Sequence, residues 1–436
     1  MRILILSAGT GSFHCGTCMR DNALARALRR LGHDAVLAPM YLPMVLDEPS
    51  AAGNTPLFYG GINVFLQQIS ALFRRTPRWM DRLLDSPVLL RLAGARAGMT
   101  SPRKLADLTL SMLRGEEGRQ AKELERLARW ARDERPDVVC LSNALLLGLV
   151  RRLRQETGAA MVCTLQGEDT FLDSLPEPAR FECWRLVGER ARDCSGLLAV
   201  SRYHADLIAA RAGMDRAAIA VVPNGIDLEG YAPAPAPPDP PVIGYLARLS
   251  AAKGIGALVE AFITLRRGGR VPGVRLHAAG SMTPADEAFV AGLRRRVEAE
   301  GLRDSVRIRP NVTRQEKIAF LRGLTVFSVP ATYGESFGLY VLEALAAGVP
   351  VVQPAHAAFP ELIQATGGGL LYDPARPEAL AESLESLLLD PARARALGEA
   401  GRQAVHARFT VDAMARGVLG VFGSALASSR AARPGR

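Results

Sequence analysis

The sequence predicts an α/β protein made of two doubly wound domains, each built on a parallel sheet. Short apolar runs of strand length recur along the chain and alternate with helical patterns, which is typical of parallel strands covered on both faces. A length of 436 residues is too great for one compact domain and favours two. Six prolines within Ala232–Pro241 indicate a stiff, extended linker between the halves.

The first half carries six apolar runs that we interpret as strands. They read ILILS, AVLAP, DVVCLS, AMVCTL, GLLAVS and AIAVVP, with a helical pattern at Asn22–Leu31 after the first. We expect this domain to span residues 1–227, with a helical insertion at about 66–135, and the linker to span 228–241.

The second half repeats the scheme. Its expected strands read VIGYLA, VRLHAAG, VRIRP, VFSVP, VPVVQP and GLLYDP, and its domain is expected at 242–410. Ligands in doubly wound sheets bind beyond the carboxyl ends of the strands. The two domains would therefore face each other across a cleft that holds the ligand.

The composition is that of an ordinary globular protein, with 48% hydrophobic residues, 41 glycines and 28 prolines. No apolar run approaches the roughly 20 residues needed to span a bilayer, and the first strand is too short for a signal peptide core. Six cysteines in a chain of this length do not suggest a secreted disulfide framework. We expect a cytoplasmic protein.

The segment Tyr333–Pro350 carries the strongest chemical signal. It places Glu335 on a glycine-rich turn, Ser336 where a helix is expected to begin, and Glu343 eight residues after Glu335. The rise of a helix would separate the two carboxylates by about 12 Å, with the N–H groups of a helix start beside the first. This layout suits ribose, diphosphate and hexose in one ligand. Taken alone, two acidic residues eight apart would favour a helix cap and a solvated surface acid.

Two cations in the segment ARLSAAKG strengthen the nucleotide-sugar interpretation. Arg248 and Lys253 follow an expected strand and precede a helix, where they can neutralise a diphosphate as a planar fork and a point charge. No D-x-D-type carboxylate pair lies at a strand end, and Asp169 and Asp173 are too far apart to form one. We therefore expect no bound metal and no cofactor other than the nucleotide sugar as co-substrate.

The order R-x4-K followed by E-x7-E resembles the retaining glycosyltransferases of family 4 (group 1), which have the GT-B fold. The resemblance implies transfer of a hexose from a nucleotide-diphosphate sugar to a hydroxyl of a glycan, lipid or small molecule. It makes Arg248, Lys253 and Glu335 the catalytic residues. It also implies that Val411–Leu426, within the tail 411–436, crosses back onto the first domain. A non-catalytic or regulatory sugar-nucleotide-binding protein of the same fold, or a sugar-nucleotide epimerase, remains an alternative.

Further donor-binding positions follow from the same resemblance. The nucleotide base, the sugar, the acceptor and the oligomeric state stay open. The donor-binding positions are Gly16, Gly280, Asn311, Val312, Ser336, Phe337, Gly338, Leu339 and Glu343.

A glycine-rich loop is expected from Ser7 to Asn22, after the first strand. It contains Cys15 and Cys18, preceded by His14. A zinc site, a redox pair and small residues packing a tight loop are three interpretations of this pair, and its role stays open.

One stretch departs from the family pattern. Where many relatives have a histidine in a T-x-H-G-type sequence, this chain has Gln166, which can donate a hydrogen bond to a sugar hydroxyl but cannot titrate. The neighbouring Glu168 and Asp169 could orient the acceptor or make local turns. We assign these three residues to the acceptor side.

The insertion is basic. Residues 66–135 contain 15 arginines or lysines against 9 acidic residues, which accounts for much of the net charge of +10. One interpretation is that the insertion docks to an anionic surface, such as the inner face of a membrane. The other is that it forms an arginine-rich surface exposed to solvent. FYGGINVFLQQI, residues 58–69, before and at the start of the insertion, resembles the acceptor-side segment of starch and glycogen synthases. No recognisable nucleic-acid-binding module is present, so we expect no nucleic acid partner.

Overall fold

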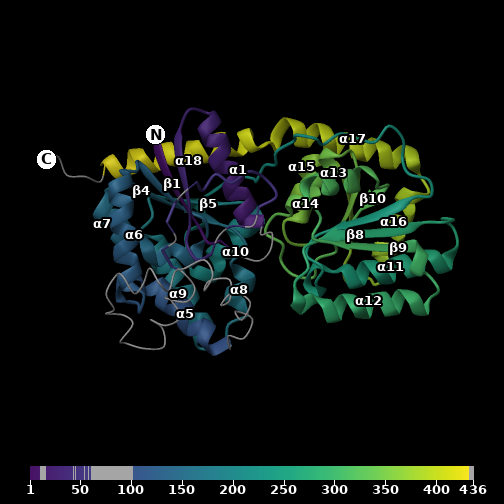
Figure 1. Cartoon of the computed structure of the whole chain (residues 1–436), viewed down its shortest axis with the longest axis horizontal. Helices are drawn as coiled ribbons and strands as arrows, with labels where there is room; N and C mark the ends of the chain where they lie inside the picture. Colours follow the sequence, from purple (N-terminus) through teal and green to yellow (C-terminus); the bar gives the residue numbers. More distant parts are fainter. Residues whose placement is uncertain are drawn as a thin grey trace. The chain divides into compact units, whose positions relative to one another are not determined.

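The computed structural model describes residues 1–9, 16–42, 44, 46–53, 55–56, 58–59 and 102–431. The chain divides into two compact units, Met1–Pro223 with Met414–Arg436, and Asn224–Ala413 (Figure 1). Each unit contains a six-stranded sheet in which every pairing between strands is parallel. The predicted fold class of two doubly wound α/β domains is confirmed.

The first sheet has the strand order β2-β1-β3-β4-β5-β6. The order reverses between β1 and β3, so the switch point of this unit lies at the carboxyl ends of those two strands. The elements are β1 (Arg2–Ser7), α1 (Gly16–Arg30), β2 (Asp34–Pro39), α5 (Pro102–Arg114), α6 (Ala121–Glu134), β3 (Val138–Leu141), α7 (Val150–Thr157), β4 (Ala160–Leu165), α8 (Asp169–Asp173), α9 (Ala179–Ala191), β5 (Gly196–Ala199), α10 (Arg202–Ala212) and β6 (Ile219–Val221).

The second sheet has the order β12-β11-β10-β7-β8-β9, with its switch point between β7 and β10. Figure 1 shows α11 and α12 on one face of this sheet and α13, α14 and α17 on the other. The elements are β7 (Val242–Leu246), α11 (Ile255–Gly268), β8 (Arg275–Gly280), α12 (Glu287–Ala299), β9 (Val306–Pro310), α13 (Arg314–Arg322), β10 (Val326–Phe327), α14 (Leu339–Ala346), β11 (Val351–Pro354), α15 (Phe359–Thr366), β12 (Gly369–Tyr372), α16 (Ala379–Leu388) and α17 (Pro391–Arg408).

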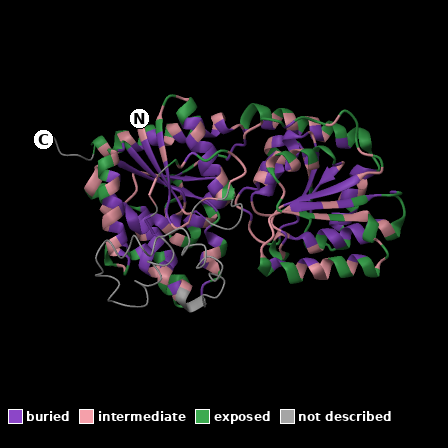
Figure 2. Cartoon of the chain, viewed as in Figure 1, coloured by how far each residue is buried: buried purple, intermediate pink, exposed green. Residues whose placement is uncertain are grey.

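All twelve predicted strands are present, and their apolar runs form the cores of the two units (Figure 2). Strands β3, β4 and β7 are buried along their whole length, as expected for parallel strands covered on both faces. The edge strand β9 is different, because Arg307 and Arg309 alternate with Val306 and Ile308. Charged side chains on an edge strand oppose pairing with another chain.

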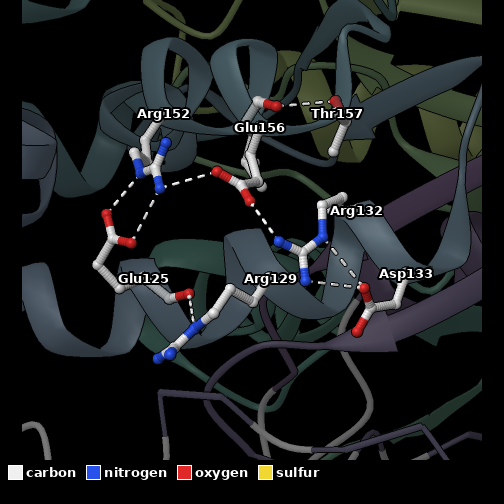
Figure 3. A network of polar contacts seen from close by, with 8 residues as sticks. Glu125, Arg129, Arg132, Asp133, Arg152, Glu156 and Thr157 are labelled. Atoms are coloured by element: carbon white, nitrogen blue, oxygen red, sulfur yellow. Dashed lines mark hydrogen bonds and ion pairs between the residues drawn. The ribbon is translucent and has the colours of Figure 1, made fainter.

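A network of ion pairs joins α6 to α7 in the first unit (Figure 3). Arg152 of α7 bonds Glu125 of α6 through two nitrogens and contacts Glu156 at 2.8 Å, and Arg132 of α6 bonds Glu156 at 3.0 Å. Shared partners hold these side chains in one geometry better than an isolated surface pair would. The network ties α6, in the described part of the predicted helical insertion, to α7.

The C-terminal helix α18 (Val411–Ala431) begins in the second unit and belongs to the first from Met414 onward. Its Val421 and Ala425 side chains lie beside Gly196 of β5. Among the described residues, no helix combines the length and apolarity needed to cross a bilayer.

The loop predicted at Ser7–Asn22 is shorter than expected. Ser7 is the last residue of β1, and α1 already begins at Gly16. The buried positions of α1 include Cys18, Arg20, Asp21 and Asn22, so polar residues that suggested a loop form the inner face of a helix. The tertiary environment of these side chains, rather than their helix propensity, decides this boundary.

Candidate functional site

Arg248 and Lys253 both follow β7, one of the two strands at the switch point of the second unit. The hydroxyl of Tyr245, buried in β7, donates to the Arg248 carbonyl at 2.8 Å and fixes the backbone there. Gly280 at the end of β8 lies against the same turn with φ at 143°, and a Cβ on it would come within 1.8 Å of the Ala247 carbonyl oxygen. Only glycine fits this close approach.

The guanidinium of Arg248 is held by a carboxylate that the sequence analysis missed. Its Nε and Nη2 donate to the two oxygens of Asp286 at 3.2 and 3.1 Å, and Nη2 lies 3.4 Å from the Thr283 hydroxyl. Burial acts to raise the pKa of Asp286, but hydrogen bonds from Thr283 and Arg248 hold it below its usual value. The Arg248 side chain is 40% exposed, so it is oriented by Asp286 and still accessible to a ligand.

Lys253 and Glu335 form an ion pair at 2.6 Å. The pair joins the segment after β7 to the segment after β10, the two strands at the switch point. The backbones meet there as well, because Thr332 donates to the Ala252 carbonyl at 3.0 Å and a Cβ on Gly254 would lie 1.8 Å from the Pro330 carbonyl oxygen. The R-x4-K and E-x7-E motifs, distant in sequence, are therefore brought together.

Two tyrosines complete the surroundings of Glu335. The Tyr333 and Tyr340 hydroxyls donate to its Oε2 at 3.1 and 2.9 Å, the same oxygen that Lys253 contacts. The Lys253 ammonium lies 4.9 and 5.3 Å from the centres of the two rings. Burial acts to raise the pKa of Glu335, yet the Lys253 charge and these hydrogen bonds lower it overall. The carboxylate is therefore ionised at neutral pH.

Glu343 has a corresponding pair of partners. Its Oε1 accepts from Lys317 of α13 at 2.7 Å and from the Tyr231 hydroxyl at 3.1 Å. The side chains of Lys317 and Glu343 are 9% and 12% exposed. Glu343 is thus no solvated surface acid, which removes that alternative.

The predicted helix start at Ser336 is wrong by three residues. Helix α14 begins at Leu339, and Gly338 caps it in the left-handed region with φ at 91°. The helical rise applies only between Leu339 and Glu343, so the estimate of about 12 Å between the two glutamates has no basis in this structure. Ser336 and Phe337 belong to the turn before the helix. The first backbone N–H groups of α14 lack intrahelical acceptors and point out of its N-terminus.

Asn311 and Val312 lie directly after β9. Asn311 adopts a left-handed φ of 55°, and its backbone N–H donates to the Gly280 carbonyl at 2.8 Å. Its side chain bonds both backbone groups of Met282, at 3.0 and 3.3 Å. Asn311 therefore ties together the loops after β8 and β9, while Val312 is half-buried beside it.

In the first unit, Gln166 and Glu168 follow β4 and are both buried. The Gln166 amide donates to the Ser142 carbonyl at 2.8 Å. The two oxygens of Glu168 accept from the backbone N–H groups of Gln166 and Ala144, at 2.6 and 3.3 Å. Glu168 therefore holds together the backbone loops that follow β3 and β4.

His204 of α10 lies beneath this loop and was missed from the sequence. It is fully buried, and its Nε2 accepts from the Gly167 backbone N–H at 3.2 Å. Its Nδ1 lies 3.9 Å from Asp169, the first residue of α8. Burial raises the pKa of Asp169, although His204 acts in the opposite direction. His204 thus contacts the backbone of Gly167, the residue that follows Gln166.

A second buried pair lies on α1, where Arg20 Nη1 donates to Asp21 at 3.0 Å with both side chains about fully enclosed. Burial raises the pKa of Asp21, while Arg20, Ser7 and Gln166 act to lower it. Gly16, predicted to bind the donor, is exposed at the N-terminus of the same helix.

Some side chains missed from the sequence carried a readable signal. Thr283 and Asp286 are three residues apart and form a capping box. Lys317 lies one helical turn before the buried Leu321, a spacing that predicts the inner face of α13. For His204, a helical position beside Ala205 and Ile208 predicts burial but not its partner.

Several predicted features lie outside the described residues. These are Cys15 and His14, residues 66–101 of the basic insertion, and most of the FYGGINVFLQQI segment. Cys18 is buried on α1. In the described part of the chain, no group of three or more His, Cys, Asp or Glu side chains is arranged to hold a metal ion.

Two family descriptions match the chain, "Glycosyl transferases group 1" over residues 232–404 and "Glycosyltransferase Family 4" over residues 106–229. Among curated proteins, the chain is 29% identical over 424 residues to a D-inositol 3-phosphate glycosyltransferase of Xylanimonas cellulosilytica, covering 87% of this chain and 94% of that protein. It is 28% identical over 427 residues to the Salinispora tropica protein of the same name, covering 85% and 82%.

Solved structures with the same fold cover nearly the whole chain. Sucrose-phosphate synthase from Thermosynechococcus elongatus aligns with a TM-score of 0.72 at 20% identity, over 98% of this chain and all of that one. Anabaena HepE in complex with UDP aligns with a TM-score of 0.68 at 18% identity, over 97% and 100%. At these identities the likeness concerns the fold.

Proposed function

We propose that this chain, which belongs to the group 1 and family 4 glycosyltransferases with the GT-B fold, transfers a hexose from a nucleotide-diphosphate sugar to a hydroxyl with retention of configuration. The observation that carries the proposal is the meeting of Arg248, Lys253 and Glu335 at the switch point of the second sheet. Ligands of doubly wound sheets bind at such a point.

The two cations would bind the diphosphate and stabilise the charge that develops on it as the sugar leaves. Arg248 is accessible and oriented by Asp286, which suits a planar fork that binds phosphate oxygens. Lys253 has three N–H donors, and in the described residues its one hydrogen bond goes to Glu335. Fixed donors aimed at a leaving group are typically worth about 3 kcal/mol each in the transition state.

Retention follows if acceptor and leaving group occupy the same face of the sugar. The bond from the anomeric carbon to the phosphate oxygen breaks, and a bond from the acceptor oxygen to that carbon forms on the same side. The acceptor hydroxyl gives its proton to the departing phosphate oxygen. Gln166 cannot act as a base, but this route needs no side-chain base because the leaving phosphate takes the proton.

Glu335 would accept hydrogen bonds from hydroxyls of the hexose, and Glu343 from those of the ribose. With two cations and the N-terminus of α14 available to the diphosphate, a divalent metal is not required for leaving-group departure. The acceptor would bind along the carboxyl ends of the first sheet, near Gln166 and Asp169. Because relatives are named for D-inositol 3-phosphate, this compound is the first acceptor to test.

The test is to incubate the purified protein with UDP-, GDP- and ADP-glucose and related donors, with inositol phosphates and simple glycans as acceptors, with and without EDTA. Formation of a glycoside with the anomeric configuration of the donor, measured by proton NMR and unchanged by EDTA, supports the proposal. An inverted product contradicts retention. Activity lost to EDTA and restored by Mn²⁺ or Mg²⁺ contradicts the metal-independent mechanism, and binding of donor without turnover favours the non-catalytic alternative.

A further inference from the structure

The two glutamates of the donor site are held in the same way. In each glutamate, a single carboxylate oxygen accepts all the hydrogen bonds that the described side chains donate. The donors are one lysine and one or two tyrosine hydroxyls. In Glu335 this oxygen is Oε2, and in Glu343 it is Oε1. The second oxygen of each carboxylate accepts no hydrogen bond from any residue in the described ranges.

The partners of Glu343 come from two separate segments, which limits its movement. Lys317 lies on α13, whose start is fixed by a capping box between Thr313 and Glu316. Tyr231 lies before β7, and the Arg314 guanidinium stacks 5.8 Å from the centre of its ring. Arg314 also donates to the Asp227 and Glu229 carbonyls, at 3.2 and 3.3 Å. The Tyr231 hydroxyl and the Lys317 ammonium therefore converge on Glu343 from fixed backbones.

Charge and burial make Lys317 the decisive partner. The Glu343 side chain is only 12% exposed, so its carboxylate depends on protein donors rather than on water for hydrogen bonds. Lys317 lies 2.7 Å from that carboxylate and compensates its charge. An ionised carboxylate is an acceptor at both oxygens, so it can receive neighbouring hydroxyls on the oxygen that Lys317 and Tyr231 leave open.

We propose that Lys317 and Tyr231 are positioning residues of the donor site, which orient Glu343 so that its Oε2 accepts hydrogen bonds from the ribose hydroxyls of the nucleotide. This inference rests on the proposed function. It assigns to the Lys317–Tyr231 pair the preference for a ribose over a deoxyribose. Glu343 alone would contact the ribose hydroxyls. Lys317 and Tyr231 would orient Glu343 without touching the ligand.

The experiment compares nucleotides with and without these hydroxyls. UDP, GDP and ADP are titrated into the wild-type protein by calorimetry, and the tightest binder is paired with its 2′,3′-dideoxy analogue. The variants are Lys317→Met, which removes the charge, and Tyr231→Phe, which removes only the hydroxyl. Arg322→Met is the matched control, since it removes an exposed cation from the same helix.

We expect Lys317→Met to weaken the ribonucleotide by about 10- to 100-fold, and Tyr231→Phe by about 3- to 10-fold, from the usual strength of hydrogen bonds to charged groups. Both variants should bind the dideoxy analogue as the wild type does. In turnover, KM for the donor should rise by more than kcat falls, because the ribose is bound equally in the ground and transition states. Arg322→Met should change neither ligand.

Equal losses for the ribose and dideoxy ligands would show that the two residues are merely structural and would overturn the inference. So would unchanged ribonucleotide affinity in both variants. If Lys317→Met does not fold, as judged by circular dichroism, Tyr231→Phe decides between these outcomes. A wild type that binds none of the three nucleotides overturns the proposed function itself, whereas wild-type binding with unaffected variants overturns only this inference.

Discussion

Both units have a six-stranded parallel sheet with a switch point, but the carboxyl edges of the two sheets use their polar side chains differently. In the second unit, the charged groups pair side chain to side chain, as Arg248 does with Asp286 and Lys253 with Glu335. In the first unit, Glu168 and His204 bind backbone N–H groups and are buried. In the second unit the Arg248 side chain stays 40% exposed and accessible to a ligand, whereas in the first unit the buried charged groups fix the shape of the loops.

This difference suggests a division of labour. A diphosphate needs fixed cations with donors to spare, which the second unit supplies. A neutral hydroxyl acceptor needs a shaped surface with a few short polar groups, which loops held from behind can supply. Substitutions in the second unit should therefore change binding and turnover, and substitutions in the first should first change stability.

The largest effect is expected from Arg248→Ala. Loss of one fixed donor to the leaving diphosphate should lower kcat by about 10²- to 10³-fold while the fold stays intact. Transfer assays with saturating donor measure the change, with circular dichroism as the check on folding. Arg307→Ala, which removes an exposed arginine from β9, is the control and should leave kcat unchanged. Near wild-type turnover in the Arg248 variant would remove the assignment.

The two glutamates should separate by ligand. Glu343→Gln should weaken both the free nucleoside diphosphate and the whole donor by about tenfold or more, because a charged acceptor of ribose hydroxyls is lost. Glu335→Gln should leave the free diphosphate unaffected in calorimetry and reduce transfer. The exposed Glu382→Gln on α16 serves as the control. The reverse pattern would exchange the two roles.

The donor motifs could be predicted from the sequence because each follows an apolar run closely, so strand order alone brings them to one edge. Arg248 lies two residues after β7 and Glu335 eight residues after β10. The partners of Arg248 and Glu343 were not predicted, because Asp286 and Lys317 reach the site from helical segments whose packing angles no local pattern encodes. The start of α14 was misplaced since Gly338, with its left-handed φ, ends a turn that reads like the first turn of a helix.

Less of the first unit could be predicted from the sequence. Gln166 was recognised as a departure from the family, but its environment depends on His204, 38 residues later, and on Ser142 at the end of the neighbouring strand. The polar residues at the start of α1, such as Asp21, were predicted to form a loop. A buried carboxylate beside a buried arginine is rare, so the pattern did not indicate the inner face of a helix. Buried polar side chains need partners that only the assembled sheet provides.

Glu168→Gln tests the structural half of the comparison. The variant places an NH₂ group where a carboxylate oxygen now accepts a backbone N–H, so one buried donor loses its acceptor. The free energy of unfolding should fall by about 1–3 kcal/mol. Tryptophan fluorescence in urea reports it, since all three tryptophans precede Pro223. The exposed Glu116→Gln is the control. Full stability with lost transfer would mean that Glu168 contacts the acceptor, and the comparison would fail.

A smaller effect is expected on stability at low pH. The pKa of Glu335 is lowered in the folded state, so its contribution to stability is present above the unfolded value of about 4.3 and disappears as pH falls through the folded value. Glu335→Gln should therefore destabilise α14 at pH 7, and the difference from wild type should shrink below about pH 4. Native-state hydrogen exchange of the α14 amides measures it. A difference that stays constant down to pH 3 would show that the ion pair with Lys253 does not stabilise the helix.

The smallest effect should have the opposite sign. Burial raises the pKa of Asp169, so its ionisation costs stability, beginning as pH rises past the unfolded value of about 3.9 and complete above the folded value. Asp169→Asn should therefore be more stable than wild type at pH 7, and equal to it at pH 3. Tryptophan fluorescence reports this change in the first unit. An asparagine variant that is less stable at pH 7 would mean that attraction between Asp169 and His204 outweighs burial. The carboxylates of the two sheet edges would then be stabilised alike, and the contrast between them would be lost.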